Sequence, residues 1–184
     1  MQRLTINPQG WLANTIICQS SHVNPRPDIS DVSLLVIHNI SLPPGQFGGD
    51  YIDDLFMGRL DCSADPYFAQ LQGLRVSAHC MINRLGIVTQ YVSFDQRAWH
   101  AGLSSFEGRD NCNDFSIGIE LEGTDEQPYT EQQYQALAAL TTALINQYPL
   151  INRERIVGHC DIAPGRKSDP GEAFDWSHYF AMLG

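Results

Sequence analysis

The chain has 184 residues, a length typical of one folded domain, and its charged fraction of 17% and hydrophobic fraction of 43% argue against disorder and against a coiled coil. A formal net charge of -10 argues against a nucleic-acid partner, because a phosphate backbone requires a basic surface. No apolar run approaches the length of a membrane span, and the N-terminal residues lack the apolar segment of a signal peptide, so we expect a cytoplasmic protein. The cysteines include no CxxC pair, which favours reduced thiols over a disulfide framework.

Hydrophobic periodicity and turn signals predict the elements of the chain. In chain order they are a loop over 22–31, a buried strand over 33–37, a short helix over 51–58, a turn from Pro66, two strands over 76–83 and 87–92 that form a hairpin, a strand over 115–121, a long helix over 130–148, a strand over 155–158 and a closing helix over 174–183. This order predicts an α/β or α+β fold with a central mixed β-sheet covered by helices on both faces. No shift in composition marks a boundary, so we expect a single domain over 1–184, with its core at about 11–180.

The strand over 115–121 and the long helix have the clearest patterns. Apolar residues alternate with small and polar ones along FSIGIEL, which places Glu120 on the less apolar face of the strand. Thr130 and Gln133 form the T-x-x-Q pattern of a capping box, and Pro149 ends the helix. The strand therefore presents one face for packing and a second face for chemistry.

Three predicted strands end in, or carry, a side chain that binds metals or moves protons. His38 follows the strand over 33–37, Glu120 lies in FSIGIEL, and His159 follows the strand RIVG. In sheets of this kind such positions converge on one crevice. A lone histidine at a strand end is more often structural than a ligand, but three such groups near a loop with further acids favour a site.

A zinc hydrolase site needs three protein ligands and an open fourth position for water. His38 and His159 supply two of them, and the third is Asp161 or Asp169 from the loop GHCDIAPGRKSDPG. We favour Asp169, because ten residues separate it from His159 and allow the loop to fold back. Asp161 lies only two residues from His159, on a chain that is leaving the strand.

Hydrolysis at such a site also needs a base and a cation that stabilises the oxyanion. Glu120 suits the base. Lys167 is the only lysine of the chain and lies two residues before Asp169, so the same loop would bring it to the metal. We therefore predict that Lys167 stabilises the oxyanion.

The remaining histidines and cysteines offer alternatives. His100 lies between small residues in AWHAG, which leaves room for a ligand or for a second contact to the metal site, whereas His79 is predicted to be a buried core residue. Cys160 next to His159, or Cys80 next to His79, suggests a cysteine nucleophile. Neighbours on a strand point to opposite faces, so adjacency does not make a Cys-His pair, and we favour the metal site.

The chain carries a series of motifs whose order and spacing identify a family. In chain order these are HNISLPPG, YFAQL, LRVSAHCMI, RAWHAG, NDFSIGIELEGTD and GHCDIAPGRKSDPG. They closely resemble the AmpD-type 1,6-anhydro-N-acetylmuramyl-L-alanine amidases, which belong to a zinc amidase family that shares its fold with peptidoglycan recognition proteins. The resemblance extends from Trp11 to Trp176 and implies that fold, with one zinc ion per chain. The site residues that it implies are the zinc ligands His38, His159 and Asp169, the general base Glu120 and the oxyanion partner Lys167.

The resemblance also implies a groove and a substrate. The candidate groove residues are Asn39, Tyr67, Arg75, Trp99, His100 and Arg109. Of these, His100 is included because its neighbours are small, and Arg109 because the family's loop before NDFSIGIE often supplies basic residues. In this loop Asn111 stands just ahead of Cys112, which puts in doubt a sugar contact assigned to that position. Acidic stem peptides would be received by Arg75, Arg97 or Arg109.

The implied reaction is hydrolysis of the amide between the lactyl group of anhydro-muramic acid and L-alanine, in cell-wall fragments recovered into a bacterial cytoplasm. The implied partner is therefore a small anhydro-muropeptide, and we expect no nucleic acid, membrane or obligate protein partner. Two alternatives remain: an amidase of broader specificity that also attacks intact cell wall, and a non-catalytic recognition module on the same fold.

Overall fold

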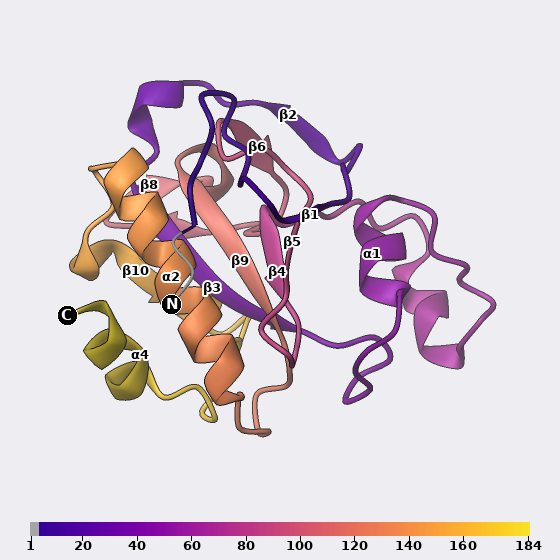
Figure 1. The fold of residues 1–184 in the computed structure, drawn as a ribbon. Coiled ribbons are helices and arrows are strands. Elements are labelled where there is room, and N and C mark those ends of the chain that lie inside the picture. The colour runs from indigo at the N-terminus through magenta and orange to yellow at the C-terminus, as the bar shows by residue number, and fades with distance from the viewer. Residues whose placement is uncertain (1–3) are drawn as a thin grey trace.

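The computed structural model of the protein describes residues 4–184, and Figure 1 shows a β-sheet with the longest helix lying across it. The strands are β1 (Ile16–Ile17), β2 (Val23–Pro25), β3 (Leu34–Ile40), β4 (Cys80–Ile82), β5 (Val88–Gln90), β6 (Gln96–Ala98), β7 (Ser105–Phe106), β8 (Arg109–Asp110), β9 (Ser116–Glu122) and β10 (Ile156–Gly158). The helices are α1 (Tyr51–Phe56), α2 (Glu131–Gln147), α3 (His159–Ile162) and α4 (Trp176–Leu183), with 3-10 helices η1 (Ile29–Asp31), η2 (Pro66–Leu71), η3 (Cys112–Asp114) and η4 (Arg153–Arg155). None of the helices in residues 4–184 is long and apolar enough to cross a membrane.

Six strands form the main sheet, in the order β1-β5-β4-β9-β3-β10. Within the described chain β4 and β5 pair antiparallel, and the other neighbours in this sheet are parallel. The central pair, β3 and β9, is aligned from Leu34 with Ser116 to Ile40 with Glu122, which sets His38 beside Glu120. The predicted fold with a central mixed sheet is confirmed.

One face of the sheet packs against α2. Alternate residues of β9, Ile117, Ile119 and Leu121, are fully buried in the main core, where Leu137 and Leu144 of α2 meet them. Helix α4 lies beside α2 on this side of the sheet (Figure 1). Burial of this apolar stripe is the main stabilising contribution of the helix, because exposed helices of this length are marginal in water.

The start of α2 agrees with its sequence signal. The Thr130 hydroxyl accepts a hydrogen bond from the Gln133 backbone N–H, and the Gln133 side chain accepts one from the Thr130 N–H. This reciprocal pair satisfies two of the free N–H groups at the helix start, and a cap of this kind contributes about 1 kcal/mol. The predicted capping box is confirmed.

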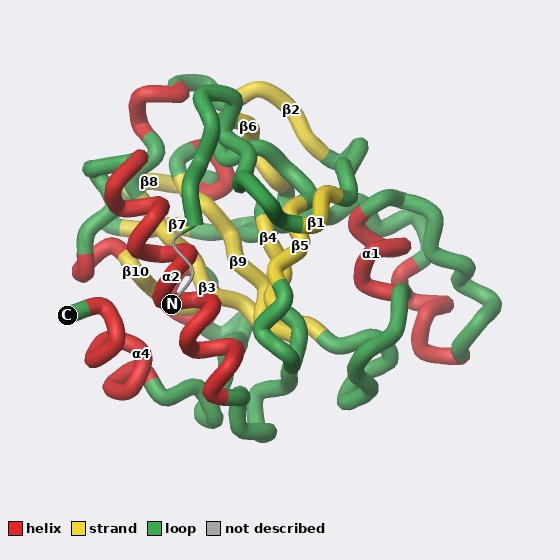
Figure 2. Tube along the Cα trace, viewed as in Figure 1, coloured by secondary structure: helices red, strands yellow, loops and turns green. Residues whose placement is uncertain are grey.

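Short helices and loops cover the opposite face. Leu34 and Val36 of β3 pack there with Ile162 of α3, and Met81 of β4 packs with Leu55 of α1. Both helices are six residues or shorter, and Figure 2 shows long loops around α1. Helices thus contact both faces, as predicted, but the cover on this side is discontinuous and leaves room for a cavity.

Several predicted boundaries were wrong. The loop predicted over 22–31 contains β2, which pairs with β6, and η1. Pro25 is tolerated because it is the last residue of a strand at the edge of a two-stranded sheet. Strand β4 begins later than predicted, because the Ser77 N–H bonds the Trp99 carbonyl instead of a sheet neighbour. Strand β3 continues through His38 to Ile40, because its pairing with β9 continues that far.

Candidate metal centre and active site

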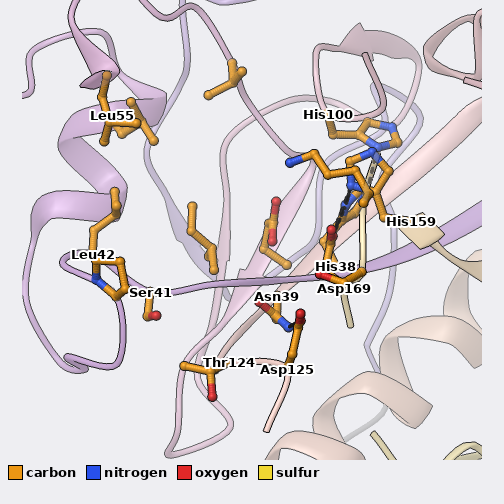
Figure 3. A pocket seen from close by; sticks show the side chains of 18 of the residues that line it. His38, Asn39, Ser41, Leu42, Leu55, His100, Thr124, Asp125, His159 and Asp169 are labelled. Carbon is orange, nitrogen blue, oxygen red and sulfur yellow. Dashed lines mark hydrogen bonds and ion pairs between the residues drawn. The ribbon is translucent and has the colours of Figure 1, made fainter. Parts of the chain in front are cut away.

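The sheet brings the predicted site residues together at the polar face of its central strands. His38 comes from β3, Glu120 from the adjacent position of β9, and His159 begins α3 directly after β10. The sequence predicts a loop at His159, but the chain turns there into a short helix. Asp169 lies in the loop beyond α3, and all four residues line one end of a cavity of about 830 Å³. Figure 3 shows His38, His159 and Asp169 converging at this end.

Three donor atoms form a compact triangle. His38 Nδ1, His159 Nδ1 and Asp169 Oδ2 lie 3.0 Å from one another on every side. In residues 4–184 this is the one group of histidine, cysteine and acidic side chains placed to hold a metal ion. A tetrahedral zinc ion with ligands at about 2.0–2.1 Å requires donors about 3.3–3.4 Å apart, so a movement of a few tenths of an ångström would admit one. The residues present fit a zinc ion.

The far nitrogens of both histidines have partners of their own. His159 Nε2 lies 3.0 Å from the Ala101 carbonyl oxygen, and His38 Nε2 lies 2.9 Å from His100 Nδ1. Because a carbonyl oxygen can only accept, His159 carries its proton on Nε2 and presents the Nδ1 lone pair to the triangle. Contacts of this kind orient the ligands in metal sites.

Asp169 is held from behind by the chain on either side of it. The Asp169 carbonyl accepts a hydrogen bond from the Cys160 N–H at 3.0 Å. The carbonyl of Pro170 accepts from the Asn39 side-chain amide at 3.1 Å and from the Tyr129 hydroxyl at 2.8 Å. The ligand loop is therefore fixed to β3 and to the segment before α2.

The electrostatics of the triangle favour the protonation states that bind a metal. Burial lowers the pKa of His38 to about 4, so its imidazole is neutral at pH 7. Burial alone would raise the pKa of Asp169, but the His159 and His38 rings, which donate to it and carry charge when protonated, hold that pKa below its usual range. The site therefore presents a neutral His38 imidazole and a carboxylate at Asp169, the forms required of ligands.

Glu120 is the unpaired acid of the site. Its side chain is 9% exposed, and its Oε2 has no hydrogen-bond partner among the described residues. Burial, and then the negative charge of Asp169, raise its pKa well above the usual range. A buried carboxyl that lines a cavity, with a raised pKa and an oxygen without a hydrogen bond among the described residues, is suited to exchange protons near neutral pH.

The other acid of the loop has a different role. Asp161 Oδ2 accepts a hydrogen bond from the Gly158 N–H at 2.7 Å, which caps α3. Asp161 is exposed and is not part of the triangle, so the preference for Asp169 agrees with the geometry. Lys167 is also exposed, and it lines the cavity next to Asp169.

Comparison with known proteins identifies the family. Residues 28–172 match the family model Amidase_2, described as N-acetylmuramoyl-L-alanine amidase. The chain belongs to the N-acetylmuramoyl-L-alanine amidase family. It is 55% identical to the 1,6-anhydro-N-acetylmuramyl-L-alanine amidase AmpD of Haemophilus influenzae, with 100% of both chains covered. It is 60% identical to AmpD of Escherichia coli, with 95% of both chains covered.

Solved structures agree with this assignment. A crystal structure of a selenomethionine AmpD derivative superposes with a TM-score of 0.94 at 58% identity, covering 97% of this chain and 99% of the other. The amidase AmiD from E. coli, in a complex with anhydro-N-acetylmuramic acid-L-Ala-D-gamma-Glu-L-Lys, superposes with a TM-score of 0.63 at 28% identity, covering 96% of this chain and 65% of that one. The chain is an N-acetylmuramoyl-L-alanine amidase with an α/β fold.

The candidate groove residues of the amidase fall into two groups. Asn39, Tyr67, Trp99 and His100 line the cavity of about 830 Å³. Asn39 also donates to Asp125 at 2.7 Å, so part of its hydrogen-bonding capacity is already used within the protein. These four residues share the space in front of the metal triangle.

The candidate arginines lie elsewhere. Arg75 lines a smaller pocket of about 150 Å³, which shares Leu55, Leu71 and Leu74 with the cavity. Arg109 is outside both pockets. Its guanidinium pairs with Asp31 at 2.6 Å. A contact of Arg109 with substrate would require this surface pair to open.

The amidase cavity also contains residues that the sequence gives no reason to select. Figure 3 shows Leu42 and Leu55 on the side opposite the metal triangle, with Ser41, Thr124 and Asp125 between them and the triangle. Leu42, Leu55 and Asp125 look like ordinary loop and helix residues in the sequence. Only the folded loops bring them to the cavity wall, so no local signal identifies them.

The cysteines do not form part of the site. All five are free, and none lines the main cavity. Burial raises the pKa of the Cys160 thiol and, well above its usual value, that of Cys80, which keeps both in the unreactive thiol form. His79 is fully buried and accepts a hydrogen bond from the Gly118 N–H at 3.0 Å, which confirms it as a core residue.

Proposed function

We propose that this amidase hydrolyses the amide bond between the lactyl group of 1,6-anhydro-N-acetylmuramic acid and L-alanine in muropeptides. The observation that supports this most strongly is the match to AmpD over the whole chain, together with the His-His-Asp triangle at the head of the cavity. The AmiD structure, described with an anhydro-muropeptide, shares the fold and supports the same class of substrate. The physiological setting would be recycling of cell-wall fragments in a bacterial cytoplasm, with which the five free thiols are compatible.

The metal of the proposed site is zinc, one ion per chain. Two imidazole nitrogens and one carboxylate oxygen, with a fourth side open to the cavity, form the donor set of hydrolytic zinc enzymes. Bound zinc would supply a water of lowered pKa and would polarise the amide carbonyl. The ligands would be His38, His159 and Asp169.

Glu120 is the proposed general base. It lies beside His38 in the register of β3 and β9, and it lines the same cavity as the proposed metal ligands. Its raised pKa matches a group that takes a proton from the attacking water and passes it to the leaving amine. A base of this kind contributes about 10²–10⁴-fold to the rate.

Lys167 is the proposed electrostatic partner of the oxyanion. It belongs to the loop that ends in Asp169 and lines the cavity. A cation placed there stabilises the negative charge that develops on the carbonyl oxygen of the amide. Tyr67, Trp99 and Asn39 are the proposed contacts for sugar and peptide in the remaining part of the groove.

The second candidate function is a broader peptidoglycan amidase with the same chemistry. It is supported by the 38% identity over 128 residues to AmiD of E. coli, whose name, N-acetylmuramoyl-L-alanine amidase, carries no anhydro qualifier. Both candidates use the same metal, base and lysine. They differ in whether the groove requires the 1,6-anhydro ring.

The test is hydrolysis of two matched substrates by zinc-loaded protein, an anhydro-muropeptide and the corresponding ordinary muropeptide, with products identified by mass spectrometry. We expect release of a peptide with a free L-alanine amine, and a kcat/KM for the anhydro substrate at least about tenfold higher, a difference of about 1.4 kcal/mol. Equal rates on both would favour the broader amidase. Binding of muropeptide without release of peptide would favour a recognition module.

A further inference from the structure

Two consecutive residues contact the far nitrogens of both metal-site histidines. The Ala101 carbonyl accepts from His159 Nε2, and the His100 ring lies against His38 Nε2. These two contacts come from the backbone and side chain of one short segment. The placement of this segment therefore sets the orientation of two ligands at once.

The hydrogen-bond pattern also fixes which nitrogen of each ring carries the proton. When His38 binds a metal through Nδ1, its Nε2 donates to His100 Nδ1, which must accept. His100 then carries its own proton on Nε2, 3.1 Å from the Ser116 hydroxyl oxygen. The contacts thus form a chain from the metal triangle into β9.

One buried side chain holds the segment in place. Asn113 Oδ1 accepts hydrogen bonds from the backbone N–H of His100 at 3.0 Å and from that of Ala101 at 2.8 Å. Asn113 is 6% exposed and lies in η3, just before β9. It does not line the cavity, so it has no route to the substrate.

The backbone of β9 at Gly118 lies directly against the His100 ring. A Cβ atom at Gly118 of β9 would lie 2.4 Å from the His100 ring, closer than side-chain atoms approach. The imidazole therefore rests directly on the backbone of the strand. Asn113 holds the backbone of His100, and Gly118 limits the space open to its ring. Together they keep the His100 ring against His38.

We propose that Asn113 is a positioning residue of the metal centre, acting through the backbone of His100 and Ala101 on both histidine ligands. This rests on the proposed zinc site. Loss of the Asn113 acceptor leaves two backbone N–H groups without their partner, and the segment must shift to find others. The shift moves the Ala101 carbonyl and the His100 ring away from the ligands, and zinc binding weakens.

A matched control is available in the same loop. The Ser104 hydroxyl accepts a hydrogen bond from the Cys112 N–H at 3.1 Å, so it also joins the loop to η3. It contacts neither ligand histidine. A Ser104→Ala variant therefore removes a similar loop contact without touching the outer contacts of the metal site.

The experiment is zinc competition with a fluorescent chelator, applied to folded wild type, Asn113→Leu, Asn113→Asp and Ser104→Ala. We expect the zinc Kd to rise about 10–100-fold in Asn113→Leu, the range for lost outer contacts. Asn113→Asp keeps an acceptor oxygen and should stay within about threefold of wild type, and so should Ser104→Ala, each below about 0.7 kcal/mol. Both Asn113→Leu and Ser104→Ala should lower the unfolding temperature of metal-free protein, which separates general stability from zinc affinity.

Unchanged zinc affinity in folded Asn113→Leu would overturn the inference while leaving the proposed zinc site intact. Wild type that binds no zinc would instead overturn the proposed function. If Asn113→Leu does not fold, Asn113→Ser takes its place, because a serine hydroxyl is too short to reach both N–H groups. Imidazole ¹⁵N spectra of zinc-loaded wild type give a second test without substitution: His100 should be neutral with its proton on Nε2, and a proton on Nδ1 would contradict the inference.

Discussion

The two faces of β9 differ in what their side chains contact. On one face Ile117, Ile119 and Leu121 are fully buried against α2. On the other face the same strand carries Gly118, which makes room for His100, and Glu120, which has a buried oxygen without a hydrogen-bond partner in residues 4–184. One strand of seven residues therefore contributes to the core and to the candidate site at alternate positions.

The comparison separates stability from chemistry. The apolar face gains free energy from burial, at about 25 cal/mol per Å² of apolar surface. The polar face costs free energy, because Glu120 is removed from water without full compensation. The packed face can offset this cost, and the site keeps a reactive carboxyl that a fully satisfied strand would lack. Substitutions on the apolar face should therefore lower stability and leave kcat nearly unchanged, whereas removal of Glu120 on the polar face should lower kcat and raise stability.

The largest expected effect is that of Glu120→Gln on the polar face. Removing the proposed base should lower kcat about 10²–10⁴-fold, the contribution of a positioned proton acceptor. The same change should raise the unfolding temperature of metal-free protein, because a neutral amide replaces an acid that burial disfavours in its charged form. Steady-state turnover and thermal unfolding measure the two effects, and a loss of stability would contradict the division between the faces.

The mirror experiment is Ile119→Ala on the apolar face. The deleted side chain is fully buried, so the free energy of unfolding should fall by about 2–5 kcal/mol. The kcat of the protein that remains folded should change less than about threefold, a difference of about 0.7 kcal/mol. Urea unfolding gives the first number, and turnover at a temperature far below the transition gives the second. A loss of kcat as large as that of Glu120→Gln would argue that the faces are coupled.

Acid should destabilise the metal-free protein through the polar face. The pKa of His38 is lowered to about 4 by burial, from about 6.5, so between these values the unfolded chain binds more protons than the folded one. Stability is therefore present above about pH 6.5 and is lost as the pH falls towards 4, by up to about 3 kcal/mol from this residue. The depressed pKa of Asp169 acts in the same direction at lower pH, whereas the raised pKa of Glu120 acts in the opposite direction. Urea unfolding of the Glu120→Gln variant at several pH values measures the slope without this opposing group, and a flat profile from pH 7 to 4 would contradict the assignment.

The smallest expected effect is that of Cys160→Ser. Cys160 neighbours a metal ligand in sequence but does not line the cavity, and burial raises the pKa of its thiol. Its replacement should change kcat/KM less than about twofold, which corresponds to about 0.4 kcal/mol. Alkylation of the wild-type thiols is an independent check. Loss of most activity in Cys160→Ser would revive the cysteine nucleophile.

Strong local patterns made the central elements predictable. The alternation in FSIGIEL and the capping box at Thr130 identify β9 and α2, and both signals depend on residues close in sequence. β1, β7 and β8 have two residues each, too few for a period to show. β7 and β8 pair with each other across a short turn, but β1 pairs with the distant β5. β2, whose prolines indicated a loop, likewise pairs with the distant β6.

The metal triangle was predictable for a different reason. His38 lies near the carboxyl end of β3, His159 directly follows the neighbouring parallel strand β10, and Asp169 lies on the return loop, so these three could be grouped before the fold was known. The groups that hold these ligands in place could not be predicted from the sequence. The Ala101 carbonyl belongs to the backbone, and Asn113 acts through two N–H groups, so neither has a sequence signature.

The most direct test of the amidase site is zinc titration into metal-free protein with turnover of anhydro-muropeptide recorded on the same samples. We predict that activity rises in proportion to bound zinc and stops rising at one ion per chain. An Asp169→Ala variant, folded as judged by circular dichroism, should bind zinc weakly and stay inactive at the same zinc concentration. Full turnover in protein that contains no zinc, or wild-type zinc affinity in Asp169→Ala, would contradict the assignment of the metal centre.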